Sequence, residues 1–160
     1  MPRTLIVGLI SDTHGLLRPK ALDLVRGSDF IVHAGDIGDP EVVPALARLA
    51  PVTAVRGNID TGAWAQSIPQ TEVLEVDGST RLYVLHTIRD LDLDPAAAGF
   101  QVVVYGHSHH PEIRWKDGVL YVNPGSAGPR RFSLPISVGR LYVSAGKVSA
   151  DLIDVEPRSR

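Results

Sequence analysis

The chain has 160 residues, a formal net charge of −2 and no cysteine. This length is typical of one domain with its own core, and the near-neutral charge gives no overall attraction for nucleic acid or an anionic membrane surface. Without cysteine there is no disulfide framework or thiolate zinc site, so any metal must be held by nitrogen and oxygen. No apolar run approaches the roughly 18 residues of a membrane span, and the run at residues 5–10 is too short for a signal peptide. We therefore expect a soluble, cytoplasmic protein that does not enter the membrane.

The first half of the chain alternates apolar runs with helical segments. Residues 5–10, 30–34 and 52–55 are continuous apolar runs, which predict strands buried on both faces. Pro19 opens a predicted helix that continues to about residue 26, and a second helix is predicted over residues 40–50. Strands that alternate with helices favour a parallel sheet with right-handed crossovers.

The second half predicts mainly antiparallel strands. Strands at 72–76 and 80–86 surround a turn, and hairpins are predicted over 112–122 and 136–155. Residues 102–105 predict one more buried strand, and residues 90–98 predict a short helix or an irregular cap. No linker or repeat divides the chain, so we expect a single domain over residues 1–160, of the α/β class, with two packed mixed sheets flanked by helices.

Metal-binding side chains gather in five short segments, placed where apolar runs end. The segments are Asp12-Thr13-His14, Gly35-Asp36, Gly57-Asn58-Ile59-Asp60, His86 and Gly106-His107-Ser108-His109. Taken alone, each resembles an ordinary polar turn or a solvated loop. Together they follow the carboxyl ends of predicted strands, the edge where open α/β sheets bind ligands. Carboxylates, an amide oxygen and imidazoles suit a pair of divalent transition metals. Enzymes use such metal pairs to catalyse displacement reactions at phosphorus.

In this order and placement the segments resemble the signature of the calcineurin-like metallophosphoesterases, and most closely their small single-domain prokaryotic phosphodiesterases. The resemblance runs from residue 5 to about residue 127 and includes the strings Ser11-Asp12-Thr13-His14-Gly15, His33-Ala34-Gly35-Asp36-Ile37 and Val122-Asn123-Pro124-Gly125-Ser126. It implies a four-layer α/β/β/α sandwich. It also implies a first metal held by Asp12, His14, Asp36 and His109, and a second held by Asp36, Asn58, His86 and His107.

The resemblance further implies a phosphodiesterase that acts on a small phosphodiester, with a hydroxide that bridges the two metals as the nucleophile. The residues it places in catalysis are Asp36, Asn58 and Asp60. We expect Asp60 to orient a metal ligand without binding the metal itself. Imidazole donors favour Mn, Ni, Fe, Co or Zn over Mg, and Mn is our first choice.

The sequence departs from the family pattern at two positions. Larger members carry a histidine directly after the asparagine of the third segment, which is thought to protonate the departing oxygen, but here that residue is Ile59. Losing a general acid slows the reaction of poor leaving groups by about 10²–10⁴-fold. We therefore expect a preference for diesters or activated esters over simple alkyl monoesters. Thr87 is the second departure, since a glycine commonly follows the metal-binding histidine.

Alternative functions use the same fold. One is a non-catalytic protein-binding subunit, which this fold provides in eukaryotic membrane trafficking where the metal site has degraded; another is a phosphomonoesterase. We expect His33 to be a buried, hydrogen-bonded histidine and the turn at residues 123–126 to shape the pocket. We keep a homo-oligomer, formed by pairing of the predicted hairpin over 136–155 with another copy of the chain, as an alternative to a monomer. The candidates for phosphate contact are Arg18, Arg56, Arg89, Arg130 and Arg131.

Overall fold

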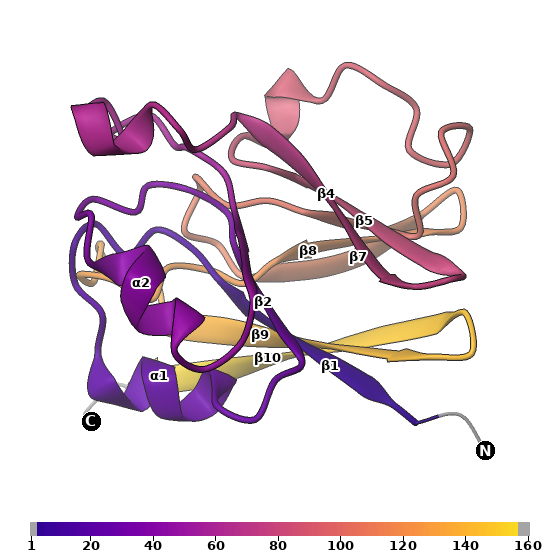
Figure 1. Ribbon diagram of the computed structural model, residues 1–160, viewed down its shortest axis with the longest axis horizontal. Helices are drawn as coiled ribbons and strands as arrows, with labels where there is room; N and C mark the ends of the chain where they lie inside the picture. The colour runs from indigo at the N-terminus through magenta and orange to yellow at the C-terminus, as the bar shows by residue number, and fades with distance from the viewer. Residues whose placement is uncertain (1–2, 157–160) are drawn as a thin grey trace.

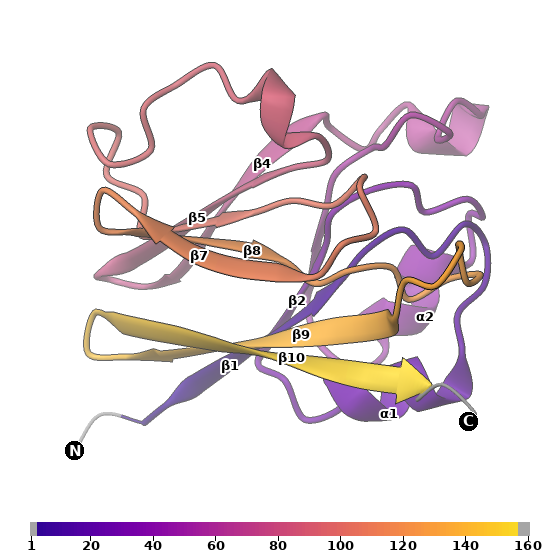
Figure 2. The same cartoon turned by 180° about the vertical axis from the view of Figure 1, so that it is seen from behind.

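The computed structural model describes residues 3–156 as two five-stranded β-sheets packed face to face (Figures 1 and 2). The strand order is β10-β9-β1-β2-β3 in sheet A and β4-β5-β6-β8-β7 in sheet B. Both sheets contain parallel and antiparallel pairs, which confirms the predicted sandwich of mixed sheets. None of the helices within residues 3–156 is both long enough and apolar enough to cross a bilayer.

Sheet A combines the start and the end of the chain. Its strands are β1 (Leu5–Ile10), β2 (Phe30–His33), β3 (Val52–Ala54), β9 (Ile136–Ser144) and β10 (Lys147–Glu156). The first three are parallel, as the alternation of strands and helices predicts. The C-terminal hairpin joins this sheet because β9 pairs with β1 in antiparallel register. Of the two strands in this hairpin, only β10 lies at the edge of the sheet. The strand β9 is paired on both sides within the chain, so it is not open to pairing with another copy.

Sheet B is formed by the middle of the chain. Its strands are β4 (Thr71–Asp77), β5 (Thr80–Leu85), β6 (Val102–Val104), β7 (Glu112–Lys116) and β8 (Val119–Asn123). The three inner strands are parallel, while β4 and β7 pair with their neighbours in antiparallel register. Both predicted hairpins of this region are present.

Two short helices cover the outer face of sheet A (Figure 1). They are α1 (Pro19–Val25) and α2 (Val42–Ala47), and they bury Val25 and Leu46 against the sheet. The helix α2 is shorter than predicted because Pro44 lacks an amide hydrogen and its ring excludes a preceding helical turn, while Pro51 disfavours helix at the residue before it.

The outer face of sheet B is covered by a loop. The segment between β5 and β6 contains only the 3₁₀ helix η2 (Ile88–Asp90), and its Leu91 and Leu93 pack on an aromatic cluster that includes Tyr83 and Phe100. The irregular form predicted for residues 90–98 is therefore the one observed. Another 3₁₀ helix, η1 (Ala63–Ala65), was not predicted. Between the sheets lies a third apolar layer of fully buried side chains such as Leu9, Val84 and Val104.

Candidate metal centre

All five donor segments lie at one edge of the sandwich, because each one follows a parallel strand. The first three leave β1, β2 and β3 of sheet A, and the last two leave β5 and β6 of sheet B. Parallel strands end on the same side of a sheet, so the packing of sheet A on sheet B brings the two groups of loops together. Ligand atoms of three side chains then lie within 4.8 Å of one another in two clusters, which are Asp12, His14 and His109, and Asp36, His86 and His107.

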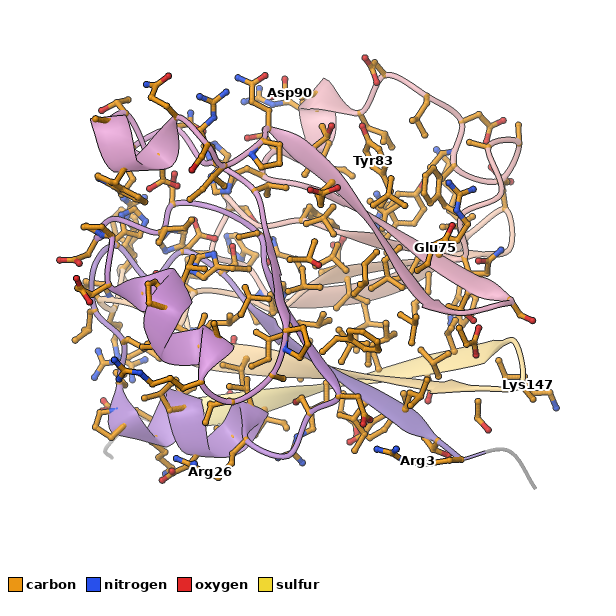
Figure 3. The ribbon with its side chains drawn as sticks, in the orientation of Figure 1. Arg3, Arg26, Glu75, Tyr83, Asp90 and Lys147 are labelled. Atoms are coloured by element: carbon orange, nitrogen blue, oxygen red, sulfur yellow. The ribbon has the colours of Figure 1, made fainter. Side chains whose placement is uncertain are left out.

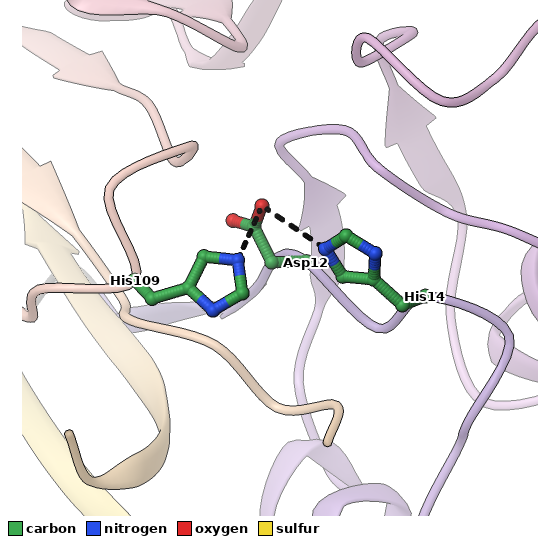
Figure 4. Close-up of side chains that lie close together, drawn as sticks. All are labelled: Asp12, His14 and His109. Atoms are coloured by element: carbon green, nitrogen blue, oxygen red, sulfur yellow. Dashed lines mark ion pairs between the residues drawn. The ribbon is translucent and has the colours of Figure 1, made fainter. Parts of the chain in front are cut away.

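The first cluster is centred on the carboxylate of Asp12. Its Oδ1 lies 3.4 Å from Nε2 of His109 and 3.9 Å from Nε2 of His14, on opposite sides (Figure 4). The Asp12 side chain is fully buried, and a carboxylate without water around it needs cationic or hydrogen-bonding partners.

The second cluster is centred on the carboxylate of Asp36. Its Oδ2 lies 3.3 Å from Nε2 of His86 and 3.6 Å from Nε2 of His14, which belongs to the first cluster. Asp36 thus stands between the two clusters, the position that the resemblance assigns to a shared ligand. Oδ1 of Asp12 also lies 3.9 Å from Nε2 of His86, so the two clusters adjoin.

Hydrogen bonds from outside hold these side chains so that one atom of each faces inward. Oδ2 of Asp12 accepts from the hydroxyl of Ser11 at 2.6 Å and from the backbone N–H of His107 at 3.1 Å. Oδ1 of Asp36 accepts from the Ile59 backbone N–H at 3.2 Å. Nδ1 of His86 lies 2.7 Å from a backbone carbonyl oxygen, to which it donates, so in the neutral ring Nε2 carries the lone pair that faces the cluster. Such outer contacts fix the orientation and tautomer of metal ligands.

Several inward-facing atoms are buried without any hydrogen-bond partner. Within the described residues eight side-chain atoms are buried without a hydrogen-bond partner, and four of them face into the two clusters: Oδ1 of Asp12, Nε2 of His14, Nε2 of His86 and Nδ1 of His107. A fifth, Nδ1 of His109, lies on the side of its ring that points away from Asp12 (Figure 4). Leaving a buried polar atom unpaired costs about 1–3 kcal/mol. Carboxylate oxygens and imidazole nitrogens that converge in this state fit divalent transition metal ions, which satisfy such atoms directly.

The ionisation of the two carboxylates agrees with this fit. Burial alone would raise the pKa of Asp36, but in the metal-free protein the positive charge of a protonated His86 and the Ile59 backbone N–H outweigh it and hold the pKa at about 2. Burial opposes ionisation of Asp12 as well, yet contacts from His109 and Ser11 lower its pKa below the usual value. Both side chains are therefore anionic at neutral pH, as metal ligands must be.

The backbone of the donor segments is strained. In the part of the chain that the structure describes, eight residues other than glycine have positive φ, and five of them are donors: Asp12, His14, Asp36, His107 and His109. The left-handed region costs roughly 1–2 kcal/mol for a residue with a Cβ atom. Strain of this kind gathers at functional sites.

Glycines allow the donor loops to approach one another closely. A Cβ on Gly57 would overlap the backbone nitrogen and Oδ1 of Asp36, and a Cβ on Gly106 would lie 2.6 Å from Oδ2 of Asp12 and overlap the Ser11 hydroxyl. These two positions accept no side chain without movement of a cluster carboxylate.

Other predicted residues support the loops or lie beside them. Asp60 is buried, and its carboxylate accepts from the backbone N–H groups of Ile37, Gly38 and Gly57 at 2.9–3.0 Å. It thus joins the segments that carry Asp36 and Asn58, instead of touching a ligand side chain. Asn58 itself is exposed and lines a cavity together with His86.

His33 is a fully buried hydrogen-bonded histidine, as predicted. Nδ1 accepts from the Gly35 backbone N–H at 3.1 Å, so Nε2 carries the proton and donates to the hydroxyl of Thr13 at 3.0 Å. That hydroxyl in turn donates to the Ile37 carbonyl at 2.8 Å. Desolvation lowers the pKa of His33 to about 4, which keeps the ring neutral.

The turn at residues 123–126 lies at the site and shapes it through hydrogen bonds. The Asn123 amide donates to the Gly106 carbonyl and to the Ser108 hydroxyl, both at 3.1 Å, and the Ser126 hydroxyl donates to the Asp12 carbonyl at 3.0 Å. Among the candidate arginines, Arg18 is occupied by Glu156 at 2.8 Å.

Comparison with known proteins decides the family. The profile of the calcineurin-like phosphoesterase superfamily domain matches residues 5–146. The chain belongs to this superfamily. A probable metallophosphoesterase of Methanocaldococcus jannaschii is 35% identical over 166 residues, which cover 96% of this phosphoesterase and 83% of the relative.

Solved structures show the same fold. An archaeal phosphodiesterase has a TM-score of 0.75 and 23% identity, with 93% of this phosphoesterase and 100% of that chain covered. Vacuolar protein sorting 29 of Cryptosporidium parvum has a TM-score of 0.75 and 18% identity, with 94% and 97% covered. The superfamily is metal-dependent, and this phosphoesterase holds candidate Asp and His ligands at one edge of its sandwich.

Proposed function

We propose that this phosphoesterase is a phosphodiesterase with a dinuclear centre, in which Asp12, His14, Asp36, Asn58, His86, His107 and His109 hold two divalent transition metal ions, Mn first among them. The observation that carries the proposal is the pair of adjoining clusters, whose buried inward atoms have no partner of their own. A bound pair of dications supplies an activated water for attack on phosphorus and neutralises the charge that develops on the phosphoryl oxygens.

Contacts of Asp36 fix the position of the proposed shared ligand. Asp36, between the clusters, is the proposed shared ligand because its Oδ2 faces both His14 and His86. Oδ1 of the same carboxylate is held by the Ile59 backbone, so rotation of the carboxylate would break this hydrogen bond. A fixed carboxylate keeps the spacing of the two sites constant, and constant spacing favours a reaction that needs two cations at once.

Ile59 supports the preference for diesters. Its side chain is 45% exposed at this edge and has no proton to donate to a departing oxygen. Aryl and other activated esters leave without protonation, whereas alkyl monoesters depend on it.

The test is hydrolysis of bis(p-nitrophenyl) phosphate by metal-stripped protein after Mn²⁺ is restored. We expect hydrolysis of this diester to be restored when the metal is added back. We expect an alkyl phosphate monoester to be hydrolysed more slowly than the diester at the same metal concentration. Absence of turnover above background with each of Mn, Ni, Co, Fe and Zn would refute the proposal.

Asp36→Ala tests the shared ligand. We expect loss of both metal equivalents by elemental analysis and of all diester hydrolysis, since Asp36 is the proposed shared ligand and faces both His14 and His86. The matched control is Asp151→Ala, an exposed aspartate on β10 in sheet A. Full activity of the Asp36→Ala protein would contradict the shared role.

A non-catalytic protein-binding role is the second candidate, and the fold shared with vacuolar protein sorting 29 is the observation that favours it. The complete donor set favours catalysis, because a scaffold has no use for five strained donor residues. A protein that binds metal at both clusters and hydrolyses no phosphoester would favour the scaffold. A diester-to-monoester rate ratio below one would favour a phosphomonoesterase.

A further inference from the structure

A cavity of about 860 Å³ opens on one side of the metal centre. Asn58 and His86 line it, whereas the side chains of the first cluster do not belong to its described lining. Ligand pockets for small molecules have volumes of roughly 300–1,000 Å³. The cavity therefore has room for a whole substituent of a phosphodiester next to the phosphoryl group.

The lining of this cavity is mainly polar. It contains the carboxylates of Asp90 and Asp92, the amides of Gln66 and Gln70 and the ring of Tyr83. Asp90 belongs to η2, and Gln66 follows η1 directly. Figure 3 shows Asp90 at the top of the molecule, between these two short helices in that view. Two segments far apart in sequence thus supply hydrogen-bonding groups to one space.

The two aspartates are free to bind a ligand. Both are exposed, and within residues 3–156 neither carboxylate pairs with a cation or accepts a hydrogen bond from the chain. Carboxylates accept hydrogen bonds from hydroxyl groups, and a carboxylate that receives ribose hydroxyls is a recurring device in nucleotide sites. The same charges repel a second phosphate group, and they find no donor on a plain hydrocarbon or aryl group.

An arginine also lines the cavity. Arg56 directly precedes Gly57 and Asn58, so it belongs to the segment that carries a proposed metal ligand. It forms no ion pair within the described residues. A guanidinium in this lining suits the phosphate of the substrate, while Asp90 and Asp92 suit its hydroxyl groups.

We infer that the cavity binds one ester arm of the substrate and selects a hydroxyl-rich, sugar-like alcohol through Asp90 and Asp92. This inference rests on the proposed phosphodiesterase function. A sugar arm satisfies the carboxylates and amides of the lining, and a bis-aryl phosphate leaves them to water.

Two substrates isolate the contribution of the hydroxyl groups. They are the p-nitrophenyl ester of uridine 5′-monophosphate and the same ester of 2′,3′-dideoxyuridine 5′-monophosphate, which share charge and leaving group. With Mn²⁺ present, we expect kcat/KM of the wild-type protein to be about tenfold higher for the hydroxylated ester, the effect of one hydrogen bond to a charged group. The double variant Asp90→Asn/Asp92→Asn should bring this ratio close to one. Asp151→Asn, on β10, removes one exposed charge elsewhere and should keep the ratio.

Binding of uridine, measured without turnover, is a second test of the cavity. In saturation-transfer NMR with metal-free protein and uridine, we expect the ribose protons to receive saturation, and the double variant to lose it. A wild-type ratio near one, or a ratio that the double variant leaves unchanged, overturns the inference, while hydrolysis of bis(p-nitrophenyl) phosphate keeps the proposed function intact. If no diester is hydrolysed, the proposed function fails, and the NMR result alone decides: saturation at the ribose supports the cavity as a sugar site, and its absence overturns it.

Discussion

Gly57→Ala tests whether close packing of the loops positions the metal centre. A Cβ atom at residue 57 would lie 2.8 Å from Cγ of Asp36 and would overlap its Oδ1 and backbone nitrogen. Real Cβ atoms keep at least 3.0 Å from such neighbours, so the segments of residues 36 and 57 must move apart. The backbone nitrogen cannot rotate away as a side chain can. Displacement of Asp36 is therefore the direct result of the added methyl group.

The magnitude follows from overpacking and from the geometry of the centre. Inserting a methyl group into a packed site costs about 1–3 kcal/mol in the free energy of unfolding. Asp36 lies within 3.3 Å of His86 and 3.6 Å of His14, so its movement disturbs both clusters. A misplacement of about 1 Å can cost about 10²-fold in rate. We expect Gly57→Ala to lose metal and to lower kcat/KM for bis(p-nitrophenyl) phosphate by about a hundredfold.

The assay combines three measurements on one preparation: urea unfolding of the metal-free protein, metal content by elemental analysis, and diester turnover. The control is Gly78→Ala, since a Cβ there meets no atom within 4 Å. Both variants remove one glycine, so both restrict the unfolded chain alike and their difference reports the clash. Equal stability and equal metal content of the two variants would refute the packing argument.

Further predictions concern His33, Asp60 and Ile59. Because the pKa of His33 falls from 6.5 to about 4 on folding, the unfolded chain binds the proton first, and metal-free protein should lose up to about 3 kcal/mol of stability as the pH falls from 6.5 to 4. Urea unfolding at pH 7 and pH 4.5 should show a smaller loss for His33→Asn; equal losses would contradict a buried neutral ring. Asp60→Asn cannot accept all three backbone N–H groups, so unfolding should be easier by about 1–3 kcal/mol, and unchanged stability would exclude this structural role. Ile59→His should raise the rate for an alkyl diester more than for bis(p-nitrophenyl) phosphate, about tenfold or more in the ratio of the two rates if the ring reaches the departing oxygen, and an unchanged ratio would show that it does not.

Much of the fold could be predicted because its strands are buried on both faces. The apolar run at residues 5–10 coincides with β1, and the run at 102–105 contains β6. Strand order could not be predicted, because it depends on pairings between distant parts of the chain. Leu5 pairs with Val143, and nothing local to either residue indicates this partner.

The donor residues could be predicted from their place after strands, but their supports could not. His86 was identified as a lone histidine at a strand end, and the structure places it in the second cluster. The contacts of Asp60 with three backbone amides depend on how two loops fold against each other. Positive φ at Asp12 or His109 has no clear signal in sequence, since aspartate and histidine, although several-fold enriched in this region, still adopt it at only a small share of their positions.

The cavity likewise depends on tertiary packing. Asp90 and Asp92 carry no motif, and they reach the space beside His86 only because the loop after β5 lies across sheet B. Sequence alone predicted an irregular cap in this region and assigned it no role.

Each cluster takes donors from both halves of the sandwich. Asp12 and His14 belong to sheet A and meet His109 from sheet B, while Asp36 belongs to sheet A and meets two histidines from sheet B. Occupation of either cluster therefore cross-links the two sheets, and any ligand that binds only the folded state raises the temperature of unfolding in proportion to the logarithm of its concentration over Kd. The melting temperature thus becomes a ranking of the affinities of candidate metals that needs no substrate.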